Sequence, residues 1–323
     1  MPGIAMNRQR LLVFAAIVGL LGAGPAAAKP YLYPITAVPN SILTTIFGIN
    51  DKGIATGSWY DPENVEHGYI GSPDGSKYTT FDDQTDPGTE PRGLNDANIV
   101  TGFDNSQSGS ADSYIPFERA SDGTITDLAK KGVTLNDLIQ GINKNGVFTG
   151  SYATTSLQIV GYTGKNAKFT GGIKLKGITN TGVAGRGIDA AGDIVGWYYD
   201  ASGAQHGFLL PAGRNPTTIN STAKNTVSTV LESINDKGLI TGQYTDTSGD
   251  IHGFIYDIAQ KAFREIKVPG AASFVQAWGI NNKGWVAVGS DAGYFVYCPS
   301  FSKCVGTAAP YRAPKQKLHP QLP

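Results

Sequence analysis

Cysteine and methionine are scarce, with two of each among 323 residues, and charged residues make up only 16% of the chain. The 26 basic and 26 acidic residues balance, so the chain lacks the basic excess with which proteins bind nucleic-acid phosphates. It also lacks a Walker-type glycine loop and any His/Cys cluster with zinc-site spacing. These absences disfavour nucleic-acid partners, nucleotide-dependent chemistry and zinc chemistry.

The composition that remains favours a folded β protein. Hydrophobic residues account for 40% of the chain and aromatic residues for 10%, which is enough to bury a sizeable core and excludes disorder throughout. Glycine is abundant at 42 residues, whereas the Ala/Glu/Lys/Leu/Met mixture of helical proteins is under-represented. We therefore expect an all-β protein with many turns.

The N-terminal segment has the features of a secretory signal peptide. Arg8 and Arg10 precede an apolar run at 11–21, and the small residues 26–28 end the segment. The apolar run is short of the roughly 18–20 residues needed to span a bilayer, which disfavours the alternative of a membrane anchor. The sequence predicts a signal peptide at 1–28 cleaved after Ala28, no membrane span in the mature chain, and a periplasmic or secreted protein.

The two cysteines lie close together near the C-terminal end. Cys298 and Cys304 flank a five-residue segment, and an exported protein meets an oxidising compartment. A disulfide is the favoured interpretation. A metal-binding pair is the alternative, although two thiolates without a nearby His or third Cys do not complete a tetrahedral site.

A motif of the form Gly-Ile-Asn-x-x-Gly recurs along the chain and sets the fold prediction. Its starts are separated by 45, 48, 46, 46 and 46 residues. The six copies begin at Gly48, Gly93, Gly141, Gly187, Ser233 and Gly279. A period of this length indicates a repeat protein.

The fifth repeat shows most clearly how one unit folds. Strands are predicted at 229–234, 239–244, 252–256 and 263–268, with the first two joined by the Asn235–Gly238 turn. Four antiparallel strands in about 46 residues are typical of a propeller blade. The sequence predicts an all-β propeller of six four-stranded blades over residues 29–306.

The chain ends predict how the ring closes. Residues 33–40 resemble the fourth-strand segment 263–270, and the last repeat lacks a convincing fourth strand of its own. We expect the N-terminal strand to complete the last blade. The proline-rich tail at 307–323 has no core pattern, and we expect it to be disordered.

Two segments carry a resemblance to a known family. Residues 200–208 read Asp-Ala-Ser-Gly-Ala-Gln-His-Gly-Phe and residues 246–254 read Asp-Thr-Ser-Gly-Asp-Ile-His-Gly-Phe, each after a motif turn. They resemble the HAF-repeat family of bacterial extracellular proteins, with His-Gly-Phe or His-Gly-Tyr in place of His-Ala-Phe. The repeats without the histidine depart from that pattern. The resemblance implies an exported repeat protein and no particular reaction.

Candidate functional residues recur within the repeats. An acid lies six residues before a histidine three times, and an aromatic residue lies nine residues after the motif Asn or Asp. Each pair would pin a hairpin loop, with ligand or metal binding and acid–base catalysis as the alternatives. The aromatic residues would pack between blades or form a rim on which sugars stack. The candidate ligand-binding residues are Asp61, His67 and Trp59, then Asp200, His206 and Tyr198, then Asp246, His252 and Tyr244.

No cofactor, structural metal or catalytic residue is predicted. Acid-rich loops at 82–86 and 246–250 leave Ca²⁺ open, although neither has EF-hand spacing. We expect an exported binding or scaffold module for a glycan, a cell-envelope component or a protein. The alternative is an exported carbohydrate-active or lyase-type enzyme. A Ca²⁺ in the central channel or a cleft of convergent carboxylates would favour the enzyme, and a flat aromatic rim with repeated equivalent pockets would favour multivalent binding.

Overall fold

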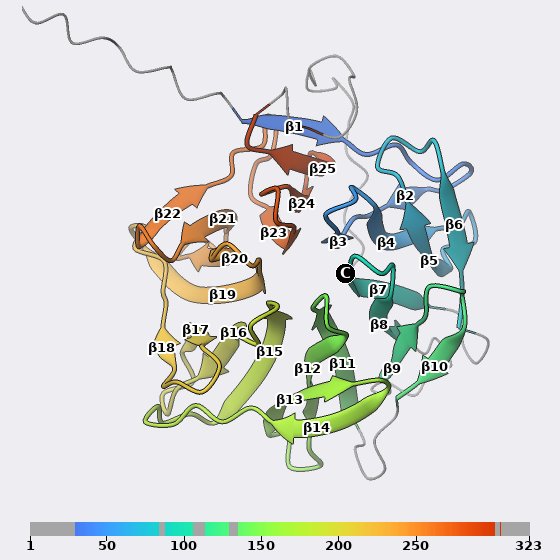
Figure 1. Cartoon of the computed structure of the whole chain (residues 1–323). Coiled ribbons are helices and arrows are strands. Elements are labelled where there is room, and N and C mark those ends of the chain that lie inside the picture. The colour runs from blue at the N-terminus through green and yellow to red at the C-terminus, as the bar shows by residue number, and fades with distance from the viewer. Residues whose placement is uncertain (1–29, 84–87, 106–113, 129–134, 301–303, 305–323) are drawn as a thin grey trace, which may run out of the picture.

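The computed structural model describes residues 30–83, 88–105, 114–128, 135–300 and 304. These residues form six antiparallel sheets arranged in a ring around a central axis (Figure 1). The ring confirms the predicted six-bladed propeller. The predicted signal peptide at 1–28 and tail at 307–323 lie outside the described residues. Within the described part of the chain, no helix is long and apolar enough to cross a membrane.

Each blade runs from an inner strand at the axis to an outer strand at the rim. In blade 1 the inner position is shared by β2 (Leu43–Thr44) and β3 (Gly48–Ile49), followed by β4 (Ala55–Tyr60), β5 (Glu66–Gly71) and β6 (Tyr78–Phe81). Blade 2 contains β7 (Thr89–Leu94), β8 (Val100–Asn105), β9 (Tyr114–Arg119) and β10 (Ile125–Asp127). Blade 3 contains β11 (Leu135–Ile142), β12 (Val147–Ala153), β13 (Ile159–Lys165) and β14 (Lys168–Gly172).

The second half of the ring repeats this order. Blade 4 contains β15 (Gly182–Ile188), β16 (Ile194–Tyr199), β17 (Gln205–Leu210) and β18 (Thr217–Thr218). Blade 5 contains β19 (Thr226–Ile234), β20 (Leu239–Asp246), β21 (Ile251–Asp257) and β22 (Ala262–Glu265). Blade 6 contains β23 (Val275–Ile280), β24 (Val286–Ser290) and β25 (Gly293–Cys298), with β1 (Tyr31–Pro34) as its outer strand.

The N-terminal strand closes the ring, as predicted. β1 pairs antiparallel with β25, with Tyr31 opposite Cys298 and Pro34 opposite Phe295 (Figure 1). The strand begins two residues earlier than the segment identified from the sequence. Tyr33 is buried in a cluster with Ile46 of blade 1 and Val296 of blade 6. The backbone runs from β1 into blade 1, so the noncovalent pairing of β1 with β25 joins the two ends of the chain and closes the ring.

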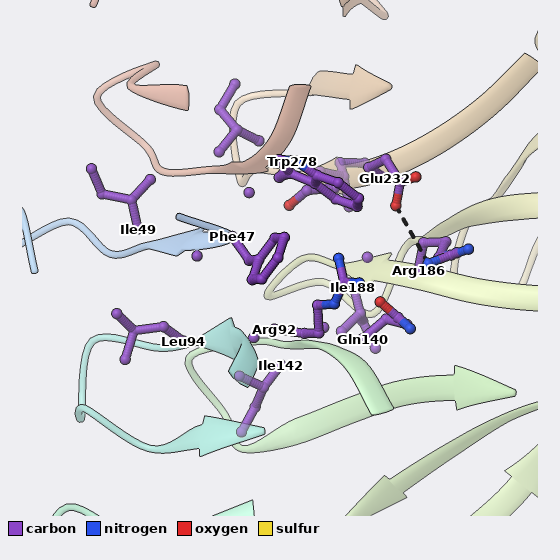
Figure 2. Close-up of a pocket in the computed structure, with 18 residues that line it drawn as sticks. Phe47, Ile49, Arg92, Leu94, Gln140, Ile142, Arg186, Ile188, Glu232 and Trp278 are labelled. Carbon is purple, nitrogen blue, oxygen red and sulfur yellow. Dashed lines mark ion pairs between the residues drawn. The ribbon is translucent and has the colours of Figure 1, made fainter. Parts of the chain in front are cut away.

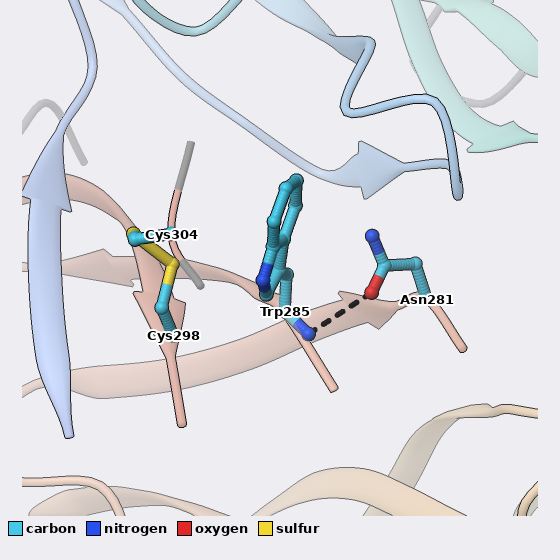
Figure 3. Close-up of a disulfide and its surroundings, with 4 residues drawn as sticks. All are labelled: Asn281, Trp285, Cys298 and Cys304. Atoms are coloured by element: carbon cyan, nitrogen blue, oxygen red, sulfur yellow. Dashed lines mark hydrogen bonds between the residues drawn. A yellow bond between two sulfur atoms is a disulfide. The ribbon is translucent and has the colours of Figure 1, made fainter. Parts of the chain in front are cut away.

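A disulfide joins Cys298 and Cys304, which confirms the predicted pairing and leaves no thiolates for the alternative metal pair. Cys298 is the last residue of β25 and is fully buried, and Trp285 lies in the same cluster (Figure 3). The bond ties the residues after β25 to the blade that β1 completes.

The motif turns fold as the sequence predicted. Five of them end in a glycine with positive φ, such as Gly53 at 79° and Gly238 at 74°, a conformation that costs glycine little. Blade 2 has Asn98 at this position with φ of 61°. The first motif glycine has a different role: a Cβ on Gly48 would lie 2.9 Å from the Arg92 carbonyl oxygen of blade 2. Glycine there lets neighbouring inner strands approach closely around the axis.

Most of the core lies between blades. One buried cluster joins Ile255 and Ile266 of blade 5 to Val288 and Phe295 of blade 6, and similar clusters join the other neighbours. Full burial of an aliphatic or aromatic side chain is worth about 1.5–3 kcal/mol. Each blade therefore depends on both neighbours, and the fold requires a complete ring.

Antiparallel pairing gives the ring two distinct faces. The turn face carries the motif turns at 50–53, 95–98, 143–146, 189–192, 235–238 and 281–284, which join first to second strands. The loop face carries the opposite ends of the strands, including the loops between second and third strands at 61–65, 154–158, 200–204 and 247–250. The connections from one blade to the next also start and end on the loop face.

Candidate functional site

A central channel runs between the inner strands, and each blade contributes the residue that directly precedes its motif. The free space around these residues is about 80 Å³. Ligand pockets usually measure about 300–1,000 Å³, so the channel has room for a few waters and not for a sugar ring. The six residues are Phe47, Arg92, Gln140, Arg186, Glu232 and Trp278 (Figure 2).

Aromatic and charged side chains fill most of this channel. The Arg92 guanidinium lies 4.1 Å from the ring centroid of Phe47 and 4.7 Å from that of Trp278. The two rings meet edge to face at 5.2 Å. An ion pair of 3.8 Å joins Arg186 to Glu232 of the next blade (Figure 2). These contacts link blades across the axis and narrow the passage.

The motif asparagines form a belt of hydrogen bonds around the channel. In each of five blades, the side-chain Nδ2 donates to the backbone carbonyl of the equivalent residue in the next blade. The links run from Asn50 to Asn95 (3.1 Å), Asn95 to Asn143 (3.2 Å), Asn143 to Asp189 (2.7 Å), Asn235 to Asn281 (2.8 Å) and Asn281 to Asn50 (2.9 Å). Asp189 has no amide with which to donate the sixth link.

The same asparagines also hold their own turns. The Asn50 Oδ1 accepts from the backbone N–H groups of Lys52 at 3.1 Å and Ile54 at 3.0 Å, and the other motif asparagines repeat this pattern. An asparagine is the residue type whose short side chain carries both the acceptor and the donor that these two tasks need. The motif Asn is therefore explained by ring assembly. The hydrogen bonds between blades could not be predicted from the sequence, because the partner of each asparagine lies about 46 residues away.

Acidic residues surround the turn-face mouth of the channel and form a second belt. Asp96 Oδ1 accepts from the Asp51 N–H at 2.8 Å, and Asp236 Oδ1 accepts from the Ala190 N–H at 2.9 Å. Lys144 Nζ donates to Asp236 Oδ2 at 3.0 Å, and this contact raises the pKa of Lys144. These carboxylates are used in joining blades.

The three predicted Asp–His pairs all form, one in each of blades 1, 4 and 5 on the loop face. The Nε2–Oδ2 distances are 3.3 Å for His67–Asp61, 3.0 Å for His206–Asp200 and 3.1 Å for His252–Asp246. The other ring nitrogen contacts a residue that follows or ends the outer strand of the same blade. These partners are Asp82 (2.9 Å), Asn220 (2.9 Å) and Glu265 (3.2 Å). Each histidine thus connects the hairpin loop to the outer edge of its own blade.

The aspartates of these pairs also hold the loop backbone. Asp61 Oδ1 accepts from the Val65 N–H at 2.8 Å, and this bond is the main cause of its lowered pKa. Asp246 Oδ1 accepts from the Ser248 N–H at 2.8 Å and the Asp250 N–H at 3.1 Å, while its His252 contact contributes most to its lowered pKa. The oxygens of Asp246 are therefore engaged within the loop that the sequence left open for Ca²⁺.

The three predicted aromatic residues belong to these same units. Each lies directly across from its histidine in the strand register. Trp59 stacks on His67 at 4.4 Å and Tyr244 on His252 at 4.6 Å, measured between ring centroids, while Tyr198 lies 5.2 Å from His206. Tyr198 and Tyr244 are buried, and Tyr244 packs between blades 4 and 5. The aromatic and the Asp–His patterns, which look separate in the sequence, form one structural unit per blade.

A stability measurement distinguishes the structural from the functional interpretation of these units. We expect His206→Ala and His252→Ala each to lower the free energy of unfolding by about 1–2 kcal/mol, because each removes hydrogen bonds that hold a partly buried loop. The effects should add in the double variant, since the two histidines have no partner in common. Chemical denaturation of both single variants and the double variant, with metal analysis of the wild type, provides the test. Unchanged stability with joint loss of a bound ligand or metal would show a shared functional site instead.

Sequence reasoning missed a buried acidic cluster between blades 1 and 2. Glu66 is only 3% exposed, and burial, followed by the charge of Glu90, raises its pKa to about 7. Glu90 pairs with Arg92, the residue that stacks between the channel aromatics. Burial and Glu66 raise the pKa of the Tyr60 hydroxyl. No repeat pattern marks these positions, because the cluster occurs at one contact between blades.

Comparisons with known proteins show similarity in fold only. No protein-family model and no curated protein matches the chain. Among solved structures, TolB from Acinetobacter baumannii superposes with a TM-score of 0.53 at 14% identity, over 77% of this chain and 64% of TolB, so this chain spans less than two thirds of TolB.

Two further structures are similar over more of their length. AofleA from Arthrobotrys oligospora has a TM-score of 0.50 at 10% identity, over 85% of this chain and 87% of AofleA. The β-propeller domain of the trilobed protease from Pyrococcus furiosus has a TM-score of 0.45 at 7% identity, over 80% of this chain and 93% of that domain. Structural similarity at such low sequence identity indicates a shared architecture and does not indicate a shared function. The six sheets in a ring establish the chain as a six-bladed β-propeller, and the superpositions on TolB and AofleA agree with this fold.

Proposed function

We propose that this chain is a binding and scaffold propeller that presents its loop face to a glycan, a cell-envelope component or a protein partner. The proposal rests on one observation: most of the exposed large hydrophobic side chains lie on that face, distributed over blades 1, 3 and 5. In the described part of the chain there are five such residues, and four of them belong to the loop face. They are Ile42 and Leu43 before β3, Leu157 in the β12–β13 loop and Val227 at the start of β19; the fifth, Tyr78, begins β6 on the turn face.

The loop face also has an open groove beside the most exposed of these residues. Leu157 is 73% exposed and borders a groove of about 610 Å³ between blades 3 and 4. The groove is also lined by Ile159, Asn180 and Tyr199. An aromatic ring, apolar side chains and amides in one groove provide stacking and hydrogen bonding together, which suits a sugar or an extended peptide. The filled channel lacks such space.

The resemblance to HAF-repeat proteins and the predicted signal peptide support a partner outside the cytoplasm. A signal at 1–28 would export the propeller, and an exported binding module meets envelope glycans and envelope proteins. Cleavage after Ala28 is directly measurable, because the mature protein isolated from the producing cell would begin at Lys29.

A binding screen with paired variants tests the proposal. The predicted mature chain at 29–306 is screened against glycans and cell-wall fractions, and the selected ligand is titrated against Leu157→Asn. Leu157 has φ of 62°, which asparagine tolerates well, so the loop should keep its shape. We expect about 10-fold weaker binding, because apolar contact of one leucine is worth about 1.5 kcal/mol or more. The control Tyr78→Ser, on the turn face, should bind normally. The opposite pattern, or no ligand in the screen, would contradict the proposal.

The buried cluster around Glu66 favours the second candidate, a carbohydrate-active or lyase-type enzyme. A carboxyl with a pKa of about 7 suits general acid–base catalysis, and Arg92 and Tyr60 are its neighbours. Glu66 is buried and lines neither the channel nor the groove. Cleavage of the selected glycan by the wild type, lost in Glu66→Gln with binding retained, would assign the enzyme.

A further inference from the structure

Three aspartates meet on the loop face where blade 1 connects to blade 2. Asp83 follows β6 at the end of blade 1, Asp104 lies near the end of β8, and Asp127 ends β10. One carboxylate oxygen of each lies within 4.8 Å of the oxygens of the other two. The cluster therefore brings the connection between the blades against two strands of blade 2.

Asp104 occupies an unusual position in this cluster. Its side chain is fully buried, with no exposed surface, between Thr89 of β7 and Ile115 of β9. Neither of its carboxylate oxygens has a donor within full hydrogen-bond geometry, although the Thr89 hydroxyl lies close by. A buried carboxylate without a donor is costly, and nearly all buried polar groups in folded proteins have a partner. This side chain, aimed at two other carboxylates, requires a proton or a cation.

The groups with the largest effects on the pKa of the Asp104 carboxyl are mainly other carboxyls, and no cationic side chain is among them. Burial raises the pKa of Asp104 to about 9, with Asp83 and Asp127 adding to the shift. Burial and Asp83 raise the pKa of Asp127 to about 6. The Thr89 hydroxyl nearby acts in the opposite direction on Asp104, and it carries no charge. A divalent cation would turn this repulsion into attraction.

We propose that Asp83, Asp104 and Asp127 bind one Ca²⁺ ion that fastens the connection between blades 1 and 2. The donors are all carboxylate oxygens, which suit hard cations and disfavour zinc, for which nitrogen and sulfur ligands are typical. Ca²⁺ lies about 2.3–2.6 Å from each oxygen ligand, so two ligands of one ion lie up to roughly 5 Å apart, in agreement with the cluster. Ca²⁺ also accepts irregular coordination, whereas Mg²⁺ demands near-octahedral geometry. Backbone carbonyls and water would complete the shell.

Calorimetry and thermal unfolding of the mature chain at pH 7.5 test this site. We expect one Ca²⁺ per chain, and a melting temperature about 5 °C higher in 1 mM CaCl₂ than in EDTA, because an ion that binds the folded state stabilises it by mass action. Mg²⁺ at the same concentration should give a much smaller shift. Asp104→Asn should abolish both the binding heat and the Ca²⁺ shift. Asp127→Asn, a change at an exposed position, should weaken binding at least 10-fold if Asp104→Asn fails to fold.

A matched control separates this site from nonspecific binding by acids. Asp250→Asn removes an acid from the other acid-rich loop and should leave the Ca²⁺ response unchanged. A Ca²⁺ response that persists in Asp104→Asn and Asp127→Asn, or an equal response to Mg²⁺, would overturn the assignment. No binding heat in the wild type would show that Asp104 is held neutral by a proton instead, which would equally overturn it.

Discussion

A chain that lacks residues 30–40 is expected to lose more than about 5 kcal/mol of its unfolding free energy. The deletion removes β1, and with it the buried Tyr33 and the pairing with β25. Loss of one buried aromatic side chain alone costs about 3–5 kcal/mol. The deletion also exposes Val296 and Ile46, which Tyr33 covers at the contact between blades 6 and 1. Thermal unfolding of the two proteins side by side measures the loss.

Rescue by a peptide distinguishes ring closure from a general folding defect. A synthetic peptide of residues 30–40, added to the truncated protein, should raise its melting temperature in a concentration-dependent way, because the closure is noncovalent. A peptide with Tyr33→Ser should have a much smaller effect. A truncated protein that melts with the full chain would show that the ring holds without β1.

The second large effect is expected at Asn281, whose amide closes the belt between blades 6 and 1. Its Nδ2 donates to the Asn50 carbonyl at 2.9 Å, and its Oδ1 accepts from the Lys283 and Trp285 N–H groups, each at 3.0 Å. Asn281→Ala removes all three hydrogen bonds, of which those with the Asn50 carbonyl and the Trp285 N–H are buried, at about 1–3 kcal/mol for each buried bond lost. We expect a loss of about 3–5 kcal/mol in denaturant-induced unfolding. A loss below about 1 kcal/mol would show that the belt is incidental.

The reciprocal change, Asp189→Asn, supplies the missing link of the belt. The new amide could donate to the Asn235 carbonyl, and we expect a gain of about 1 kcal/mol at pH 7. Burial raises the pKa of Asp189, so its charged form destabilises the fold above that pKa, and this cost disappears as the pH falls below the ordinary carboxyl value. The advantage of the variant should therefore shrink between pH 7 and pH 4. A variant less stable than the wild type at pH 7 would contradict this account.

The motif period predicted the ring because repeats of one length can bury their faces only against one another. The fold of each blade could also be predicted from the sequence, since turns and strands are marked by residues that are close together in the chain. The Asp–His contacts were predicted for the same reason: six residues apart, each pair spans one hairpin loop.

The remaining features depend on positions that only the closed ring brings together. Trp59 and His67 could be joined into one unit only once the strand register was known. Arg92 meets Phe47 and Trp278 across the axis from three blades, and Asp83 meets Asp104 and Asp127 through a connection between blades. No pattern along the chain marks such contacts, because each occurs once.

Hydrogen–deuterium exchange with the ligand selected in the screen tests most directly that the loop face binds and the turn face assembles the ring. We expect the ligand to slow exchange in the loop-face segments 155–159 and 180–182 beside the groove. The motif turns at 50–53 and 281–284 should exchange at the same rate with and without ligand. Protection confined to the motif turns, with none beside the groove, would show that the turn face binds the ligand instead.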